Sequence, residues 1–220
     1  MKVKSLNKMN FKSILTVVLL IISFFGYSQE KQIFESPKMK EFISSHKKVA
    51  ILPFKATISY KKLPKDFNVE ANKAEEIKLG SQMQSGMYTY LLNKSSDYVV
   101  EVQDVDKTNV LLNKSGLMDK LDEAASEDLA KILGVDAVIK CSYAYEKTKS
   151  EGAAIALTLL VGFGTGKVAS GALTMQINDA KEGALVWRFY KQMAEDVMSS
   201  PTAMMERMMR KVGRNFPYQK

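Results

Sequence analysis

The residues best suited to covalent chemistry in this sequence are its single histidine, His46, and its single cysteine, Cys141. A nucleophilic serine or cysteine needs a base beside it, and His46 lies in a polar stretch directly before Lys47 and Lys48, where we predict a solvated side chain. Cys141 lies among apolar residues of a predicted strand, which favours a buried thiol over a nucleophile. We therefore predict no catalytic residue and no enzymatic activity.

Residues 159–167 combine an apolar run with Gly162, Gly164, Gly166 and Lys167, as a phosphate-binding loop does. Such a loop also needs a glycine five positions before the glycine that precedes the lysine, and a serine or threonine directly after the lysine. Val161 and Val168 occupy these two positions. The register argues against nucleotide binding, and we predict no cofactor.

Neighbouring carboxylates, such as Glu75 with Glu76 and Asp122 with Glu123, lie on predicted helices. Adjacent helical residues point to different sides, so these pairs indicate solvated helix faces rather than a general acid and base. No close group of acidic residues has the spacing of metal ligands, and we predict no metal site. A glycoside hydrolase is left open, although nothing specific supports one.

The first 28 residues have the features of a secretory signal peptide. Four lysines and no acid precede a 12-residue apolar run from Ile14 to Phe25, and Gly26-Tyr27-Ser28 provides a cleavage context. The run is shorter than the roughly 20 residues that a membrane-spanning helix needs, and a retained anchor is the minor alternative. Removal of this leader lowers the formal charge from +8 to +4, because 28 basic residues then face 24 acidic ones. The remaining charge is mild and dispersed, which argues against a nucleic-acid partner.

Residues 29–220 have the composition of one globular α/β domain, with 46% hydrophobic and 25% charged residues in the whole 220-residue chain. Hydrophobic periodicity predicts a mixed β-sheet of about five strands flanked by helices, with an apolar insert before the C-terminal hairpin. The predicted strands are 47–54, 98–105, 137–145 and the hairpin pair 172–178 and 185–192. The predicted helices are 36–45 with Ser36 as N-cap, 71–93, a turn at 109–112, 126–133 capped by Ser126 and ended by Gly134, and 200–214. A polar loop is predicted from Lys55 through Pro64.

Four segments carry a family likeness, in order along the chain. They are the apolar strand 49–54 that ends in Pro53-Phe54, residues 91–101 with 110–112 and 116–117, residues 129–139 around Gly134, and the spaced set Asp179, Gly183 and Trp187. Together they resemble the curli production assembly/transport component family, the lipoprotein activators of penicillin-binding proteins and the amino-terminal domain of the Tol-Pal translocation protein. Val102 departs from the pattern, because the family has an arginine there. The resemblance implies structural roles for Pro53, Phe54, Gly134, Asp179, Gly183 and Trp187, and a role without covalent chemistry.

The last predicted helix has a methionine-rich stripe that includes Met204 and Met208, and a basic face with Arg207, Arg210 and Arg214. A core helix whose methionines cover the sheet is the simpler interpretation. The alternative is a basic amphipathic surface that meets an anionic lipid or a partner groove.

The segment 151–171 is too apolar for an ordinary loop. Ile155, Leu157, Leu159 and Val161 alternate, Phe163 follows, and Gly162 to Gly166 could form a turn. The resemblance places a membrane-spanning hairpin of the curli channels at this junction. The weakly apolar return strand and the missing second hairpin argue against a closed pore, so a contact with a partner or a membrane surface is the leading interpretation.

These observations predict a protein of the periplasm or one associated with the outer membrane. We expect it to assist envelope assembly or secretion through protein–protein contacts, without enzymatic activity. We expect an envelope protein partner, contact with a membrane surface or self-association, and no nucleic acid. A protomer of a curli-type secretion channel is the alternative function.

Overall fold

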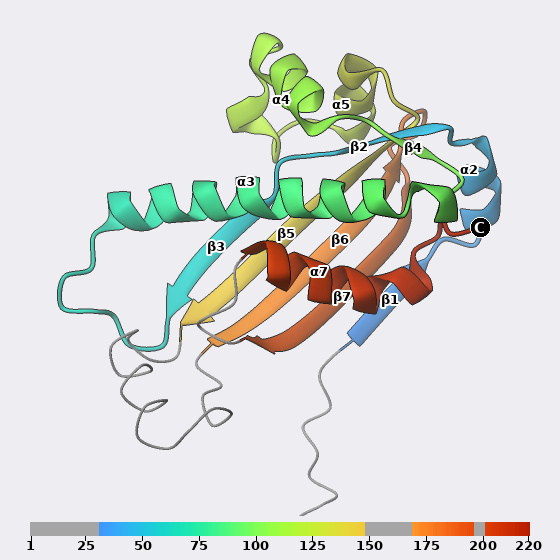
Figure 1. The fold of residues 1–220 in the computed structure, drawn as a ribbon. Coiled ribbons are helices and arrows are strands. Elements are labelled where there is room, and N and C mark those ends of the chain that lie inside the picture. The colour runs from blue at the N-terminus through green and yellow to red at the C-terminus, as the bar shows by residue number, and fades with distance from the viewer. Residues whose placement is uncertain (1–30, 148–168, 196–200) are drawn as a thin grey trace, which may run out of the picture.

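The computed structural model describes residues 31–147, 169–195 and 201–220. These residues form a seven-stranded mixed sheet in the order β1-β7-β6-β5-β2-β4, with β3 pairing β5 beside β2 (Figure 1). The strands are β1 (Lys31–Glu35), β2 (Lys48–Ile51), β3 (Lys55–Tyr60), β4 (Glu101–Val102), β5 (Ala137–Lys147), β6 (Ala169–Asp179) and β7 (Leu185–Glu195). The α/β prediction is confirmed, although the sheet has more strands than the five expected.

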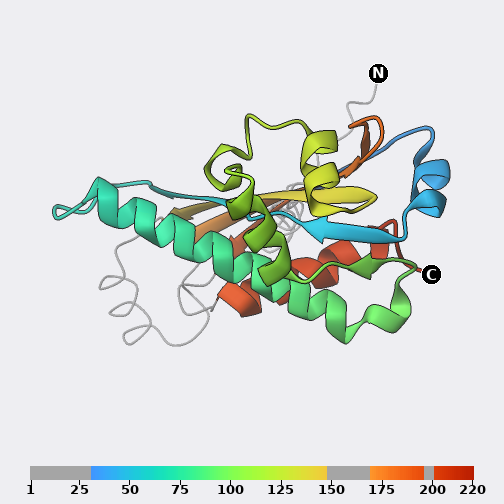
Figure 2. The ribbon, with the colours of Figure 1, turned by 90° about the horizontal axis from the view of Figure 1, so that it is seen from above.

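The helices lie on both faces of this sheet. They are α2 (Met39–Ser45), α3 (Val69–Asn93), α4 (Val105–Lys114), α5 (Ser126–Leu133) and α7 (Pro201–Val212), with single 3-10 turns at Ser95–Asp97, Met118–Lys120 and Gly213–Asn215. Figure 2 shows α3 and α7 on one face and α5 on the other. The larger hydrophobic core lies under α3 and α7, and a smaller one lies under α4 and α5. None of the helices in the described ranges is long and apolar enough to cross a membrane.

The chain bends after the first buried strand and returns to the sheet as a further strand. Residues 55–60, predicted as part of a polar loop, form β3 and pair in parallel with β5 from Lys55 opposite Ser142 to Tyr60 opposite Lys147. The prediction was wrong because the pattern is weakly apolar, with Ile58 as the buried residue of this strand. β3 is stabilised by pairing with β5 and by contact with α3 rather than by its own hydrophobicity.

Helix α3 begins where Asn68 caps it, since the Asn68 side chain accepts a hydrogen bond from the backbone N–H of Ala71 at 2.8 Å. Gly80 allows the helix to approach β3, because a Cβ there would lie 2.5 Å from the Phe54 carbonyl oxygen. Helix α3 and the backbone before β3 are therefore in direct contact at this glycine. Ile77 is 67% exposed, since the face of α3 that meets the sheet is centred on Met83 and Met87.

Two predicted elements were too long, and β1 was missed in addition to β3. The strand expected at 98–105 has only Glu101–Val102 in the sheet, because Asp104 caps α4 through the backbone N–H of Lys107 at 3.0 Å. Helix α2 begins at Met39 rather than at Ser36, whose hydroxyl accepts a weak bond from the Lys38 N–H at 3.3 Å. β1 was not predicted at all, since it is five residues long and mostly exposed.

The helix at 126–133 and the C-terminal hairpin are confirmed. Gly134 ends α5 with a φ of 65°, and Gly183 has a φ of 64° in the turn between β6 and β7. Ser126 does not cap α5 with its side chain, as the cap position is Ala125. Trp187 is fully buried on β7 and its ring stacks on that of Phe189.

Candidate functional site

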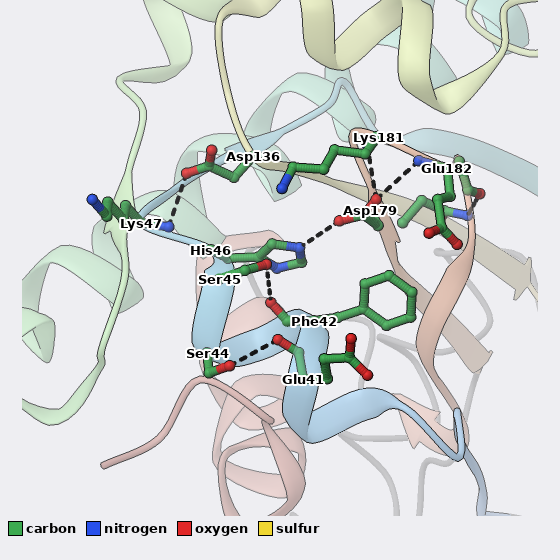
Figure 3. A network of polar contacts seen from close by, with 12 residues as sticks. Glu41, Phe42, Ser44, Ser45, His46, Lys47, Asp136, Asp179, Lys181 and Glu182 are labelled. Atoms are coloured by element: carbon green, nitrogen blue, oxygen red, sulfur yellow. Dashed lines mark hydrogen bonds and ion pairs between the residues drawn. The ribbon is translucent and has the colours of Figure 1, made fainter.

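His46 lies at the centre of a buried polar network that joins three distant parts of the chain, and Figure 3 shows its contact with Asp179. It follows α2, and its Nε2 lies 2.9 Å from Oδ1 of Asp179 at the end of β6. Its Nδ1 lies 2.8 Å from the hydroxyl of Tyr218, near the C-terminus. The predicted solvated histidine was wrong, since His46 is 4% exposed. The local sequence did not reveal this, because both partners are far away along the chain.

The Asp179 carboxylate receives hydrogen bonds on both oxygens. Its Oδ2 accepts from the backbone N–H groups of Lys181 at 2.8 Å and Glu182 at 3.0 Å, within the hairpin turn. Burial raises the pKa of Asp179, but the hydrogen bonds from His46, Glu182 and Lys181 outweigh it, so the pKa lies below its ordinary value. An ionised carboxylate only accepts hydrogen bonds, so Nε2 of His46 carries the hydrogen that joins the two side chains.

Asp136 provides a second carboxylate anchor close to this network (Figure 3). Its Oδ2 accepts from the backbone N–H groups of Lys47 at 2.8 Å and Lys48 at 2.9 Å, where β2 begins. Burial raises the pKa of Asp136. The two backbone hydrogen bonds and the charges of His46 and Lys47 have the opposite effect and outweigh burial, so the pKa lies below its usual range. Both acidic groups therefore hold backbone in place.

The Tyr218 hydroxyl holds the last residues of the chain against the sheet. Burial raises the pKa of Tyr218, and the nearby carboxylates of Asp179 and Asp136 raise it further. The neighbouring backbone is also fixed, because the Val99 N–H donates to the Tyr218 carbonyl at 2.9 Å and Tyr98 bridges to Gln219. The arrangement of a histidine between an aspartate and a hydroxyl resembles a hydrolase triad. Here the three groups are enclosed, so the arrangement stabilises the fold and positions the C-terminal segment.

Cys141 is buried on β5, as predicted. Burial raises the pKa of its thiol, and its Sγ lies 4.0 Å from the Met87 sulfur. A protonated thiol in this position is a poor nucleophile.

Glu75 and Glu76 on α3 point to different partners, as predicted, but they are not simply solvated. Glu76 accepts from the Ile58 N–H at 2.7 Å, whereas Glu75 pairs with the Lys147 ammonium at 2.9 Å. The helix predicted for Asp122 and Glu123 was wrong, because both lie in the turn between residues 118–120 and α5, where Asp122 forms an ion pair with Lys55. In the parts of the chain that the structure describes, no three histidine, cysteine or acidic side chains gather as metal ligands.

The C-terminal segment forms one wall of a groove of about 870 Å³, which we call the basic groove. Its walls come from β1, β7, the end of α3, α7 and residues 213–219. Seven cationic side chains line it, namely Lys31, Lys94, Lys191, Arg207, Arg210, Lys211 and Arg214. Among the described residues that line it, Asp97 is the one carboxylate. Among the described lining residues, cations therefore outnumber carboxylates, although Lys94 and Arg210 also pair with Asp97 and Glu206.

Aromatic and amide groups complete the basic groove. Tyr90 and Tyr98 line it from the end of α3 and the segment that follows, and Asn215 and Gln219 line it from the C-terminal wall. Lys94 lies over the Tyr90 ring at 5.7 Å, and its ammonium is 3.8 Å from the Asp97 carboxylate. Burial, with Tyr90 and Asp97 nearby, raises the pKa of Tyr98 to about 12, so its hydroxyl stays protonated and can donate.

The basic groove contains some of the predicted contact residues and excludes others. Arg207 and Arg210 line it, and Arg210 also pairs with Glu206 at 2.6 Å. Met204 and Met208 do not line the basic groove, because both pack into the larger core, where they are 5% and 1% exposed. The core-helix interpretation of these methionines is confirmed. The spacing of the arginines indicated this site, whereas Lys31 and Lys191 were missed because folding alone brings them there.

The predicted contacts at Ile155, Leu157, Leu159, Val161 and Phe163 lie outside the described residues, as does the predicted signal peptide. The predicted structural positions are placed as follows. Phe54 is buried in the larger core beside Gly80, Pro53 is half-buried at the bend after β2, Asp179 belongs to the His46 network, and Gly134, Gly183 and Trp187 have the positions given above.

A second groove, of about 600 Å³, lies between α3, the segment 118–123 and the bend after β2. The amides of Gln84 and Asn109 line it and bond to each other at 3.0 and 3.1 Å. Burial lowers the pKa of Lys140 there, although Asp122 and Glu127 raise it in part. This second groove is lined by both cations and carboxylates, so it should favour anionic ligands less than the basic groove does.

Comparison with known proteins gives no family assignment. No family model matches the sequence, and neither does any curated protein. Solved structures of similar fold include a PelC dodecamer from Paraburkholderia phytofirmans, 15% identical, with a TM-score of 0.41 over 87% of this chain and 98% of that one. The lipoprotein GNA1162 from Neisseria meningitidis is 11% identical, with a TM-score of 0.46 over 77% and 97% of the two chains.

The C-terminal domain of LpoB from Escherichia coli is also similar, at 11% identity and a TM-score of 0.34 over 72% of this chain and 94% of that one. Because every TM-score is below 0.5, we base no functional argument on these structures.

Proposed function

We propose that this protein is a non-enzymatic accessory protein of the cell envelope that binds an acidic segment of a partner protein in the basic groove. The observation that carries the proposal is the convergence of seven cationic side chains, with one carboxylate among the described lining residues, on a single groove. Carboxylates bound by guanidinium groups form short, charge-assisted hydrogen bonds, often two at a time.

Binding without catalysis accounts for how the reactive residues are used. His46 and Cys141 are both enclosed, and His46 has its two ring nitrogens engaged by Asp179 and Tyr218. The groups that reach solvent in the basic groove are mainly lysines, arginines and amides, which hold anions without covalent chemistry. This distribution supports a protein that recognises rather than transforms its ligand.

The shape of the site favours a protein segment over a bilayer. A concave groove encloses an extended chain, whereas a membrane surface is flat and is best met by a convex basic face. Tyr90, Tyr98 and Met193 add apolar contact area beside the cations, which suits a peptide with mixed side chains. The envelope location rests on the predicted leader at residues 1–28.

A binding experiment with defined probes tests this function. A fluorescent glutamate-rich peptide should bind the purified chain, and salt should weaken the complex. Reversing two exposed groove charges, with Lys211→Glu and Arg214→Glu together, should reduce the affinity at least tenfold. The matched control, Lys73→Glu with Lys131→Glu, changes the same net charge at exposed helix positions outside the groove. Equal loss in both variants, or preference for phosphatidylglycerol vesicles over the peptide, would contradict the proposal.

A secretion-channel protomer is the second candidate. One observation favours it: the β5–β6 ladder is paired to its last residues, Lys147 and Ala169, which flank the apolar segment. A ring-shaped oligomer extracted by detergent would support this candidate. The channel candidate would be excluded if the protein were a monomer in the periplasmic fraction and if the double variant Leu157→Asp with Leu159→Asp fractionated in the same way.

A further inference from the structure

Strand β1 forms one edge of the sheet and directs half of its backbone groups outward. It pairs with β7 on one side and ends the strand order. The Ser36 N–H donates to the Val186 carbonyl at 2.9 Å, which fixes the alternation of the antiparallel ladder. Gln32 and Phe34 therefore bond toward β7, and the N–H and C=O groups of Lys31, Ile33 and Glu35 point away from the sheet.

The other long edge of the sheet is closed by side chains. On β3, the Ile58 N–H donates to the Glu76 carboxylate at 2.7 Å, and the Ile58 carbonyl accepts from the Asn72 amide at 3.2 Å. Such contacts prevent an edge strand from pairing with another chain. β1 instead carries Phe34, a large apolar side chain that is 47% exposed. Side chains of α3 thus block pairing at the β3 edge, whereas the β1 edge carries an exposed apolar side chain.

We propose that β1 is the pairing edge for a second copy of this chain, in an antiparallel register centred on Ile33. In that register Ile33 faces Ile33 of the second copy, and Lys31 faces Glu35 of the second copy at both ends of the seam. The outward N–H and C=O groups of these three residues match one another, so the ladder continues across the two sheets.

The charges select this register over its neighbours. Residues whose backbone groups point outward must pair with one another, so the register can shift only by two residues. Such a shift pairs Ile33 with Lys31 or with Glu35 of the second copy. Either shift separates the two Lys31–Glu35 contacts and leaves a charge opposite an apolar residue. The centred register satisfies both charges and uses all five residues of β1.

The opposite face of the seam gives a second source of attraction. Gln32 and Phe34 lie on this face, and in the centred register each faces the other residue of the second copy. The two Phe34 rings are then diagonal neighbours, a separation that aromatic side chains can span. A five-residue seam is small compared with a standard interface, so we expect reversible dimers at micromolar to millimolar concentration.

A charge-exchange experiment tests the register. Both residues are exposed, so the variants should fold normally. Lys31→Glu alone and Glu35→Lys alone place like charges together and should weaken dimerisation about tenfold by analytical ultracentrifugation. A mixture of the two single variants should form heterodimers, because each then supplies the opposite charge, and the double variant should regain self-association. Lys38→Glu, outside the strand, is the matched control.

A crosslinking experiment tests the same seam without relying on charge. Ile33→Cys places two thiols at a facing pair whose Cα atoms lie about 5.5 Å apart in such ladders, within disulfide range. Oxidation should yield a covalent dimer, whereas Lys31→Cys should not crosslink because its facing residue is Glu35. A chain that remains monomeric up to about 1 mM, or equal crosslinking of both cysteine variants, would overturn the proposal. The readout is self-association. Because Lys31 also lines the basic groove, Glu35→Lys and Ile33→Cys, which lie outside the groove lining, separate dimerisation from peptide binding.

Discussion

The His46 imidazole and the Asp179 carboxylate form a buried hydrogen bond of 2.9 Å between residues that are 133 positions apart. The bond joins the end of α2 to the end of β6, and through Tyr218 it also fixes the C-terminal wall of the basic groove. A polar network in the interior stabilises a fold only when all of its members are satisfied. The stability of this protein should accordingly depend on each of them.

Replacing His46 with alanine should lower the free energy of unfolding by about 3 kcal/mol, because it leaves the Asp179 carboxylate and the Tyr218 hydroxyl buried without their partner. Urea denaturation followed by circular dichroism measures the change. Lys47→Ala is the control, since that neighbouring side chain is exposed and the Lys47 bond to Asp136 uses the backbone. An unfolding midpoint equal to that of the control would show that the network contributes no stability.

Stability should decrease in acid, because the pKa values of Asp179 and Asp136 are both lower in the folded protein. A lowered pKa contributes stability that is complete above the unfolded value of about 3.9 and is lost as pH falls through the folded value. Unfolding free energy measured from about pH 6 to pH 2 should therefore decline below about pH 4. Asp136→Asn should make this decline shallower, and a profile identical to that of the parent would refute the assignment.

Gly80→Ala should destabilise the protein by about 2 kcal/mol, because the added methyl group would meet the Phe54 carbonyl oxygen at 2.5 Å and push α3 away from β3. Thermal unfolding by calorimetry gives the comparison. Gly213→Ala is a suitable control, as its nearest contact would be the Tyr90 hydroxyl at an ordinary 3.6 Å. Similar melting temperatures for the two variants would mean that helix and strand can separate without cost.

Cys141 should not react with a thiol reagent in the native state. The side chain is buried and its pKa is raised, so both access and thiolate formation are suppressed. Labelling with a chromogenic disulfide should proceed only at the rate at which the folded protein opens and exposes Cys141, and it should become fast in denaturant. Rapid stoichiometric labelling without denaturant would place the thiol in a more open environment than β5 provides.

The sequence determined the elements whose signals are local. Apolar runs and bracketing residues identified β2, β5, the β6–β7 hairpin and α5, since Gly134 and Gly183 take up positive φ angles that other residues resist. The methionine stripe favoured a core helix at 200–214, and the burial of Met204 and Met208 in α7 confirms that interpretation. The burial of Cys141 followed from its place in the mostly apolar strand predicted at 137–145.

The tertiary structure decided what depends on distant partners. β1 and β3 are short and weakly apolar, so they exist as strands because β7 and β5 offer unpaired backbone groups. His46 is buried because Asp179 and Tyr218 supply the hydrogen bonds that offset its desolvation. The basic groove likewise forms when Lys31, Lys94 and Arg214, distributed from β1 to the C-terminal turn, are brought to one surface. Local sequence specifies which segments become helices or strands. The gathering of cations in the basic groove and the burial of His46 depend on contacts that only the folded chain makes.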